Sequence, residues 1–473
     1  MSTAVWHRAG ATPAWEVGLG LAAGLETLRA LEAHGLEPGK AAHQILFAHE
    51  LGSEIFLEIA KQRAMRLVWS KVVAASGAGE VAAADQRHVA ISSSVAATRV
   101  DPWVNLLRGT AQTFAAALGG ADGLVIRPWD APLGRPEGGA RRFALTSQYV
   151  LAQESHLRAV ADPAGGSWAL ESLTDGLARQ AWAIAQDVEK RGGLAAAIVS
   201  GYVRGKLAEL AATRRRDVAR RKTQIVGVSV FPLLGEERPV RVQPGDTLPP
   251  TRHSREGGNL SPATGYIGTE PTDLDPGLRR GDELGAVAVL QGSSPSEGGP
   301  EGGTPSIIGS PPFPSAERGA GGRGPEPSTA PALEVYRPAE DFEALRLASD
   351  AATQRPRIFL AQMGDGEGSR ARAEFCAGLF PAGGIEVVPG HVAAFAASGC
   401  RTAVLAGSDE SYATQGPDAA RALKAAGCGW LLLAGRPGDN EAELRQAGVD
   451  AFVFLGADVV AVLAEILRRE EPR

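Results

Sequence analysis

Few residues in this sequence have the types and spacing that chemistry requires. A glycine-rich stretch, Met363–Ala371, follows a short apolar run, and such a loop at a helix N-terminus can hold a phosphate through backbone N–H groups. Its spacing is not the GxGxxG pattern of dinucleotide-binding loops, and turns after strands commonly need glycine. We therefore favour a turn over a phosphate site.

The same stretch carries the acidic residues Asp365 and Glu367, and Asp409 follows a later apolar run. Paired acids after one strand and an aspartate after another partly fit a signalling receiver module. A flavodoxin-like signalling or binding module is therefore one alternative. It leaves the first half of the chain unexplained, so we rank it low.

The histidines and cysteines give little evidence for a catalytic or metal site. The three cysteines, Cys376, Cys400 and Cys428, form no CxxC pair and have no histidine nearby in sequence, which favours buried, reduced thiols and no metal site. His7 lies in the segment VWHRAGAT (residues 5–12), where we interpret it as a polar residue at a strand end rather than an active-site residue.

Composition narrows the class of protein. The chain has 473 residues, 44% hydrophobic and 22% charged, with a net charge of −6, which is typical of two or three soluble domains. The basic run at 214–216 is interleaved with Glu209 and Asp217, so it indicates a solvated helix face and not a nucleic-acid patch. With no targeting signal and no apolar stretch long enough for a membrane span, we expect a cytoplasmic protein.

Residues 1–243 alternate between the helical and the strand period. About four strand–helix units make half of an eight-stranded barrel, so either this is not a barrel or its front half is absent from the sequence. The expected helices are Trp15–His34, Ser53–Val73, Pro102–Leu118, Ala140–Leu157, Leu173–Arg191 and Tyr202–Arg220, and the expected strands are Thr3–Trp6, His43–Phe47, His88–Ser92, Gly123–Ile126 and Gln224–Phe231.

The rest of the chain divides in two. Residues 244–335 are rich in Gly, Pro and Ser and are predicted to be a flexible, disordered linker, with a repeat-like insertion of no expected function at 251–283. Residues 336–473 contain a linking helix and five strand–helix units, the size of a flavodoxin-like domain. Its expected strands are Arg357–Ala361, Ile385–Val388, Thr402–Leu405, Trp430–Leu433 and Ala451–Leu455, and its helices Ser369–Leu379, Val392–Ala397, Pro417–Ala426, Glu441–Ala447 and Val459–Arg469.

Four segments of the first zone resemble one family in order and spacing. They are EIFLEIAKQRAMRLVWSKV (54–72), DPWVNLLRG (101–109), QYVLAQESHLRAVADPAGGSWALE (148–171) and KTQIVGVSVF (222–231). They are similar to segments of the methylmalonyl-CoA mutase family, coenzyme A acyl mutases that use adenosylcobalamin. The resemblance implies an α/β chain: part of a TIM (β/α)8 barrel, a linker, and a flavodoxin-like, cobalamin-binding-type domain.

The family's barrel site is not retained on the matching positions. The catalytic histidine of its YHMQEAGAT signature falls at Val5, and the Arg and Ser of RLSFF, on the coenzyme A side, fall at Gln44 and Leu46. The Gln of QTSGWS becomes Ile91, and the His of SLHTN becomes Val125. Apolar side chains can neither donate a hydrogen bond nor transfer a proton, so the resemblance implies no catalytic or substrate-binding residue here.

The cobalamin domain shows the same loss. The family's DGHDRG histidine, which ligates cobalt, falls at Gly368, and His391 is the one histidine in this domain. Ser408 stands where a family serine contacts the cofactor's nucleotide tail, and Gly435 stands in the family's Gly-Gly pair. We interpret both as weak remnants of a cobalamin site. We expect neither cobalamin nor a metal in this chain.

This pattern resembles the small, non-catalytic subunits that some bacterial members pair with a catalytic large subunit. The resemblance implies a heterodimer that interconverts methylmalonyl-CoA and succinyl-CoA with adenosylcobalamin held in the large subunit. A competent mutase with another acyl-CoA substrate is the second alternative, but it needs a histidine ligand and coenzyme A contacts that the sequence lacks.

Overall fold

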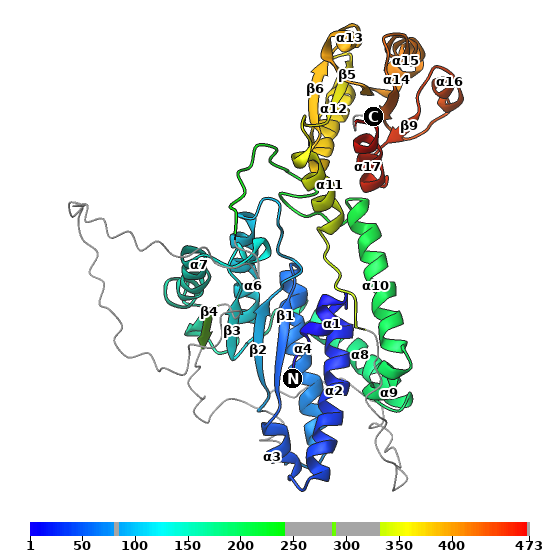
Figure 1. Ribbon diagram of the computed structural model, residues 1–473. Helices are drawn as coiled ribbons and strands as arrows, with labels where there is room; N and C mark the ends of the chain where they lie inside the picture. Colours follow the sequence, from blue (N-terminus) through cyan, green and yellow to red (C-terminus); the bar gives the residue numbers. More distant parts are fainter. Residues whose placement is uncertain (80–84, 242–285, 290–331, 471–473) are drawn as a thin grey trace, which may run out of the picture.

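The computed structural model describes residues 1–79, 85–241, 286–289 and 332–470. It is an α/β protein with two sheets, one in the N-terminal region and one in the C-terminal region (Figure 1). Most of the predicted linker (244–335) lies outside the described residues, namely 244–285 and 290–331, and so does the repeat-like insertion.

The N-terminal sheet contains three parallel strands in chain order, β1 (Leu46–Leu51), β2 (Arg87–Ser92) and β3 (Gly123–Ile126). A short strand from the predicted linker, β4 (Ala286–Val289), pairs antiparallel with β3. Helices follow the parallel strands, as strand–helix units require. They comprise α4 (Ile55–Ala75) after β1, α6 (Val104–Leu118) after β2 and α7 (Gly138–Tyr149) after β3.

Three long helices pack together beside this sheet, in one apolar cluster with Phe47 of β1. α2 (Pro13–Ala33) starts where Thr12 accepts a hydrogen bond from the backbone of Trp15 and Pro13 occupies the first turn. It packs with α4 and with α8 (Trp168–Lys190) around the fully buried Trp69. The remaining helices of this region are α3 (Pro38–His43), α9 (Leu194–Val199) and α10 (Tyr202–Ala219).

The predicted first strand, Thr3–Trp6, is wrong. Ser2 makes a single parallel bridge to Ala48, and the chain then turns into a short helix, α1 (Ala4–Arg8). The Thr3 carbonyl accepts hydrogen bonds from the amides of Trp6 and His7, which closes the first turn. The strand prediction failed here because four residues are too few to distinguish the strand period from the helical period.

The predicted strand Gln224–Phe231 is also wrong. The Ile225 carbonyl accepts from the amides of Val228 and Ser229, and Gly227 has φ +80, so this segment is a tight turn. A Cβ at position 227 would lie 2.6 Å from a carboxylate oxygen of Asp101, so glycine is required there. His43–Phe47 is displaced, because His43 ends α3 and the strand starts at Leu46.

All five strands expected in the C-terminal region are present and parallel. β5 (Arg357–Met363), β6 (Glu386–Gly390), β7 (Thr402–Gly407), β8 (Trp430–Ala434) and β9 (Ala451–Val453) lie in the order β6-β5-β7-β8-β9. Helices cover both faces, with α12 (Glu367–Leu379) and α17 (Val459–Glu470) on one side and α15 (Gly416–Ala425) and α16 (Glu441–Gln446) on the other. The short helices α13 (Phe395–Ser398) and α14 (Asp409–Thr414) follow β6 and β7.

Helix α11 (Glu340–Ala351) joins the two regions. Its Glu343 carboxylate accepts from the Arg99 amide, and its buried Arg346 donates to the Leu233 carbonyl at 2.6 Å. Arg215, from the run at 214–216, forms an ion pair with Asp341, and its side chain is 54% exposed, so it lies on a solvated helix face as the sequence predicts. In Figure 1 the amino end of the C-terminal sheet therefore faces the N-terminal region, and α13, beyond the carboxyl end of β6, lies at the far end.

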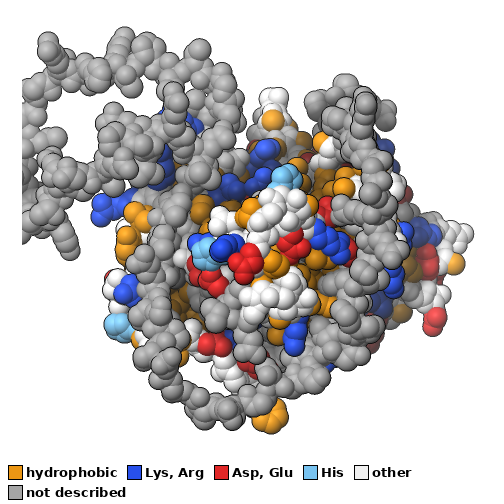
Figure 2. Space-filling model, turned by 90° about the horizontal axis from the view of Figure 1, so that it is seen from below, with side chains coloured by type: hydrophobic (Ala, Val, Ile, Leu, Met, Phe, Trp, Pro, Cys, Tyr) orange, Lys and Arg blue, Asp and Glu red, His pale blue; other side chains and the backbone are white. Residues whose placement is uncertain are grey.

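None of the helices in the described ranges is long and apolar enough to cross a membrane. On the face seen from below, Lys and Arg side chains are interspersed with Asp and Glu over the visible surface (Figure 2).

Candidate functional site

Polar side chains gather where the three parallel strands end. Glu50 is the second-last residue of β1, Ser92 is the last of β2, and Arg127 directly follows β3. The carboxyl ends of parallel strands meet at one edge, which is where barrels and doubly wound sheets place their sites. This edge is therefore the candidate site of the N-terminal region.

The Glu50 carboxylate lies at the centre of this edge and its side chain is fully buried. One oxygen accepts from Nε and Nη2 of Arg8, at 2.8 and 2.6 Å, and from Nη2 of Arg127 at 3.2 Å. The other accepts from the amide of Ser94 at 3.1 Å and from its hydroxyl at 3.2 Å. Both oxygens are thus fully bonded, so Glu50 is not placed to act as a general base.

A second buried cluster lies behind it, centred on the ammonium group of Lys61 in α4. This group forms ion pairs with Glu16 at 2.9 Å and Glu58 at 2.6 Å, and it donates to the Glu50 carbonyl at 2.5 Å. Burial alone would lower the pKa of Lys61, but the two carboxylates raise it above its ordinary value. Burial alone would raise the pKa of Glu16, but Lys61 and then His7 hold it well below its usual range.

Two buried histidines lie beside the Lys61 cluster. His7 is buried, with Nε2 2.8 Å from the Ser93 hydroxyl and Nδ1 3.3 Å from Glu16. His49 is fully buried, with Nδ1 3.0 Å from the Thr3 hydroxyl. The described residues contain no group of three or more His, Cys, Asp or Glu side chains that could hold a metal ion. The arrangement is a network of ion pairs and hydrogen bonds in which the charged groups are paired with one another.

The sequence did not single out this network, although signals for it exist. Glu58 and Lys61 are three residues apart on an amphipathic helix, and Glu50 interrupts an apolar strand. His7 was assigned to a strand end, whereas it is a helical residue bonded into the network.

Some of the positions matched to the family's barrel site lie close together in the structure, and others do not. Ile91 pairs directly with Glu50 across β1 and β2, and with Val125 across β2 and β3. Because side chains two apart share a face, Leu46 lies on the same face of β1 as Glu50 but at its amino end. Gln44 precedes that strand and is exposed, and Val5 lies on α1, 46% exposed. The structure thus brings Ile91 and Val125 beside Glu50, but not Gln44.

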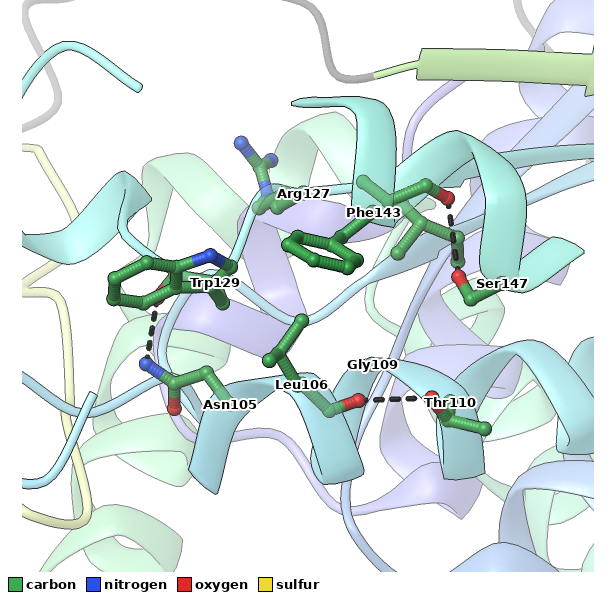
Figure 3. A pocket seen from close by; sticks show the side chains of 10 residues that line it. Asn105, Leu106, Gly109, Thr110, Arg127, Trp129, Phe143 and Ser147 are labelled. Carbon is green, nitrogen blue, oxygen red and sulfur yellow. Dashed lines mark hydrogen bonds between the residues drawn. The ribbon is translucent and has the colours of Figure 1, made fainter. Parts of the chain in front are cut away.

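A small pocket lies between α6 and α7, beside Arg127 (Figure 3). The indole Nε1 of Trp129 is buried and has no hydrogen-bond partner in the described part of the chain. The Arg127 guanidinium is already paired with Glu50, and the Thr110 and Ser147 hydroxyls donate to backbone carbonyls of their own helices, so none of these lining groups is placed to carry out a reaction. The lining residues are Asn105, Leu106, Gly109, Thr110, Ile126, Arg127, Trp129, Phe143, Ala144 and Ser147.

The C-terminal sheet has its own candidate edge, at the carboxyl ends of β5 and β7 where the strand order reverses. Gly368, matched to the cobalt ligand, lies in the first turn of α12, and a Cβ there would lie 3.4 Å from Cβ of Ser408. Ser408 caps α14 and its amide donates to the Ser369 hydroxyl at 3.1 Å. These contacts hold the β5 and β7 loops against each other.

The protein itself fills the neighbouring space between β7 and β8. The Tyr412 ring is buried, and its hydroxyl bonds the Gly407 amide at 2.8 Å and the Ala434 carbonyl at 2.7 Å. The guanidinium of Arg372 lies 5.0 Å from the ring centroid, and a Cβ at Gly435 would lie 3.4 Å from the ring. The cysteines are buried, and burial raises the pKa of the Cys376 thiol to about 12.

Buried His49 predicts that the protein is less stable in mild acid. Burial lowers its pKa from 6.5 to about 4, and Glu16 offsets this only in part. The unfolded state binds the proton first as pH falls, so this stability is complete above pH 6.5 and is lost between 6.5 and about 4. We expect a loss of about 3 kcal/mol from His49 across that window.

Denaturant unfolding at a series of pH values measures this loss. His49→Phe should flatten the slope in that window, whereas His34→Phe, at an exposed histidine of α2's C-terminal end, should leave it unchanged. Equal slopes in the two variants would mean that His49 is not the group responsible.

Known proteins resemble this chain in sequence. A family model described as methylmalonyl-CoA mutase matches residues 1–254. A methylmalonyl-CoA mutase small subunit of Streptomyces virginiae is 38% identical over 98% of this chain, and one of Propionibacterium freudenreichii subsp. shermanii is 32% identical over 98%. The chain covers 63% and 61% of these two relatives, about three fifths of their length. Methylmalonyl-CoA mutase of Escherichia coli is 34% identical over 48% of this chain and 32% of its own length.

Proposed function

Because this chain belongs to the methylmalonyl-CoA mutase family, we propose that it acts as a non-catalytic small subunit. In this role it supports a catalytic large subunit in a heterodimer that interconverts methylmalonyl-CoA and succinyl-CoA. The match to small subunits over 98% of the chain supports this choice within the family.

The proposal rests on the residues at the carboxyl end of the N-terminal sheet, the edge where a barrel places its active site. Ile91 and Val125, at two positions matched to polar family residues, are apolar neighbours on one face. The carboxylate beside them, Glu50, has every lone-pair direction taken by Arg8, Arg127 and Ser94. In the described part of the chain, the carboxylate at this edge is therefore not free to move a proton.

The fold supports the finer architecture that we propose. Three parallel strands alternating with helices fit part of a (β/α)8 barrel over residues 1–243. Numbered within the C-terminal region, the strand order is 2-1-3-4-5, the order of flavodoxin-like domains, over 336–473. We assign 244–335 as the linker between them, apart from β4 (Ala286–Val289), which pairs with β3 of the N-terminal sheet.

The residues of the C-terminal edge do not fit cobalamin. Gly368 supplies no imidazole for cobalt, and the exposed His391 follows β6 rather than β5. Tyr412 occupies the space between β7 and β8. We therefore propose that adenosylcobalamin is held by the large subunit and that this chain contributes no step through it.

We rank the competent mutase and the receiver-type module below this proposal. A competent mutase for another acyl-CoA would need the polar groups that Val5, Leu46, Ile91 and Val125 have replaced. A receiver-type module would need Asp409 beside the acids of the β5 loop, but Asp409 is bound to Arg372 at 2.6 Å.

Co-expression with the catalytic large chain tests the proposal. We expect the tagged chain to co-purify with the large chain in equal amounts, and the pair to isomerise methylmalonyl-CoA while this chain alone does not. The substitutions Val5→Ala and Ile91→Ala should leave kcat of the complex within about twofold, because neither side chain can take part in the reaction. Turnover by this chain alone, or a large loss of kcat in these variants, would refute the proposal.

A further inference from the structure

We propose that Arg8, Arg127 and Ser94 form a carboxylate-binding site at the carboxyl end of the N-terminal sheet, and that the chain's own Glu50 occupies it as an internal ligand. The class of external ligand is a short-chain carboxylate. The inference goes beyond the proposed function and does not depend on a partner chain, because it concerns binding to this chain alone.

The hydrogen-bond donors around Glu50 are of the types that bind carboxylates in proteins. Two guanidinium groups meet one oxygen of Glu50, and a backbone amide and a hydroxyl meet the other. Charge-assisted bonds of this kind are the strongest that a carboxylate forms in proteins. Two positive groups surround one negative group, so the cradle keeps a net positive charge when Glu50 is removed.

Most of the cradle is held in place without Glu50. The Arg127 amide donates to the Ser92 hydroxyl at 2.8 Å, and its Nε donates to the Ser92 carbonyl at 3.2 Å. Ser94 follows Ser93, whose hydroxyl binds His7 and the Ala96 amide. These donors should therefore keep their positions when the carboxylate is taken away.

The cradle is also reachable. The Arg8 and Arg127 side chains are 40% and 27% exposed, whereas the carboxylate between them is fully buried. Ile91 and Val125 lie next to Glu50 on the same face, so the floor beside the head group is apolar. This combination favours a carboxylate on a short apolar body over phosphate or a free metal ion.

Chemical rescue tests the site in the full chain. Glu50→Ala removes the atoms of one acetate, so added acetate can replace them. We expect the unfolding temperature of Glu50→Ala to rise with the logarithm of acetate concentration, as mass action requires, while the unsubstituted chain does not respond. Acetamide, which has the same shape without charge, and chloride at the same ionic strength should have no such effect.

The double variant Glu50→Ala/Arg127→Ala is the matched control, and acetate should bind it at least about tenfold more weakly, since it lacks one guanidinium. If Glu50→Ala does not fold in buffer, its refolding yield in acetate against acetamide becomes the measurement, and a higher yield in acetate supports the site. Equal effects of acetate, acetamide and chloride, or equal rescue of the double variant, would overturn the proposal.

Discussion

Lys61→Met should be among the most destabilising single substitutions in this protein. The ammonium group is fully buried and pairs with Glu16 and Glu58, while its third contact is the Glu50 carbonyl. Methionine fills a similar volume but leaves two buried carboxylates without their cation. Removing one partner of a buried ion pair costs about 3–5 kcal/mol, a large part of the stability of a typical domain.

Denaturant unfolding, monitored by tryptophan fluorescence, measures this effect, because Trp69 packs in the same helix layer. Lys71→Met is the matched control, since Lys71 lies on the same helix but is exposed, and it should change stability by less than about 0.5 kcal/mol. The double variant Glu16→Gln/Lys61→Met should recover part of the loss. A Lys61→Met chain as stable as Lys71→Met would show that the network does not hold the helices together.

The C-terminal region was predictable because its three central strands, β5, β7 and β8, are short, largely buried runs separated by helices. Trp430–Leu433, for example, is apolar on both faces, as a central parallel strand must be. Even there the boundaries moved, since β5 continues to Met363, two residues beyond the expected end.

The N-terminal region was less predictable where segments are short or polar. Thr3–Trp6 carries too few residues to distinguish a strand from a helical turn, and long-range contacts such as that between His7 and Ser93 decide the outcome. Glu50, Arg8 and Arg127 are distant in sequence, so no spacing rule could join them. The replacements at Ile91 and Val125 were visible in the sequence, but the carboxylate cluster beside them was not.

Placing a histidine at the family's ligand position should not create a cobalamin-binding protein. We expect the full chain, and equally Gly368→His, to leave the absorption spectrum of adenosylcobalamin unchanged at concentrations where a catalytic family member binds it stoichiometrically. Position 368 lies in the first turn of α12, where a side chain would meet Ser408.

The reason extends beyond the missing imidazole. The space between β7 and β8 is already taken by Tyr412, whose hydroxyl bonds the backbone of both strands and whose ring lies under Arg372. A bulky ligand would have to expel a buried aromatic ring, and truncating such a ring costs roughly 3–5 kcal/mol. Tyr412→Phe, which loses the hydroxyl but keeps the ring, is the matched control and should also fail to bind. Tight binding by Gly368→His alone would show that this edge opens readily and that one lost ligand, rather than a filled crevice, separates the chain from its cobalamin-binding relatives.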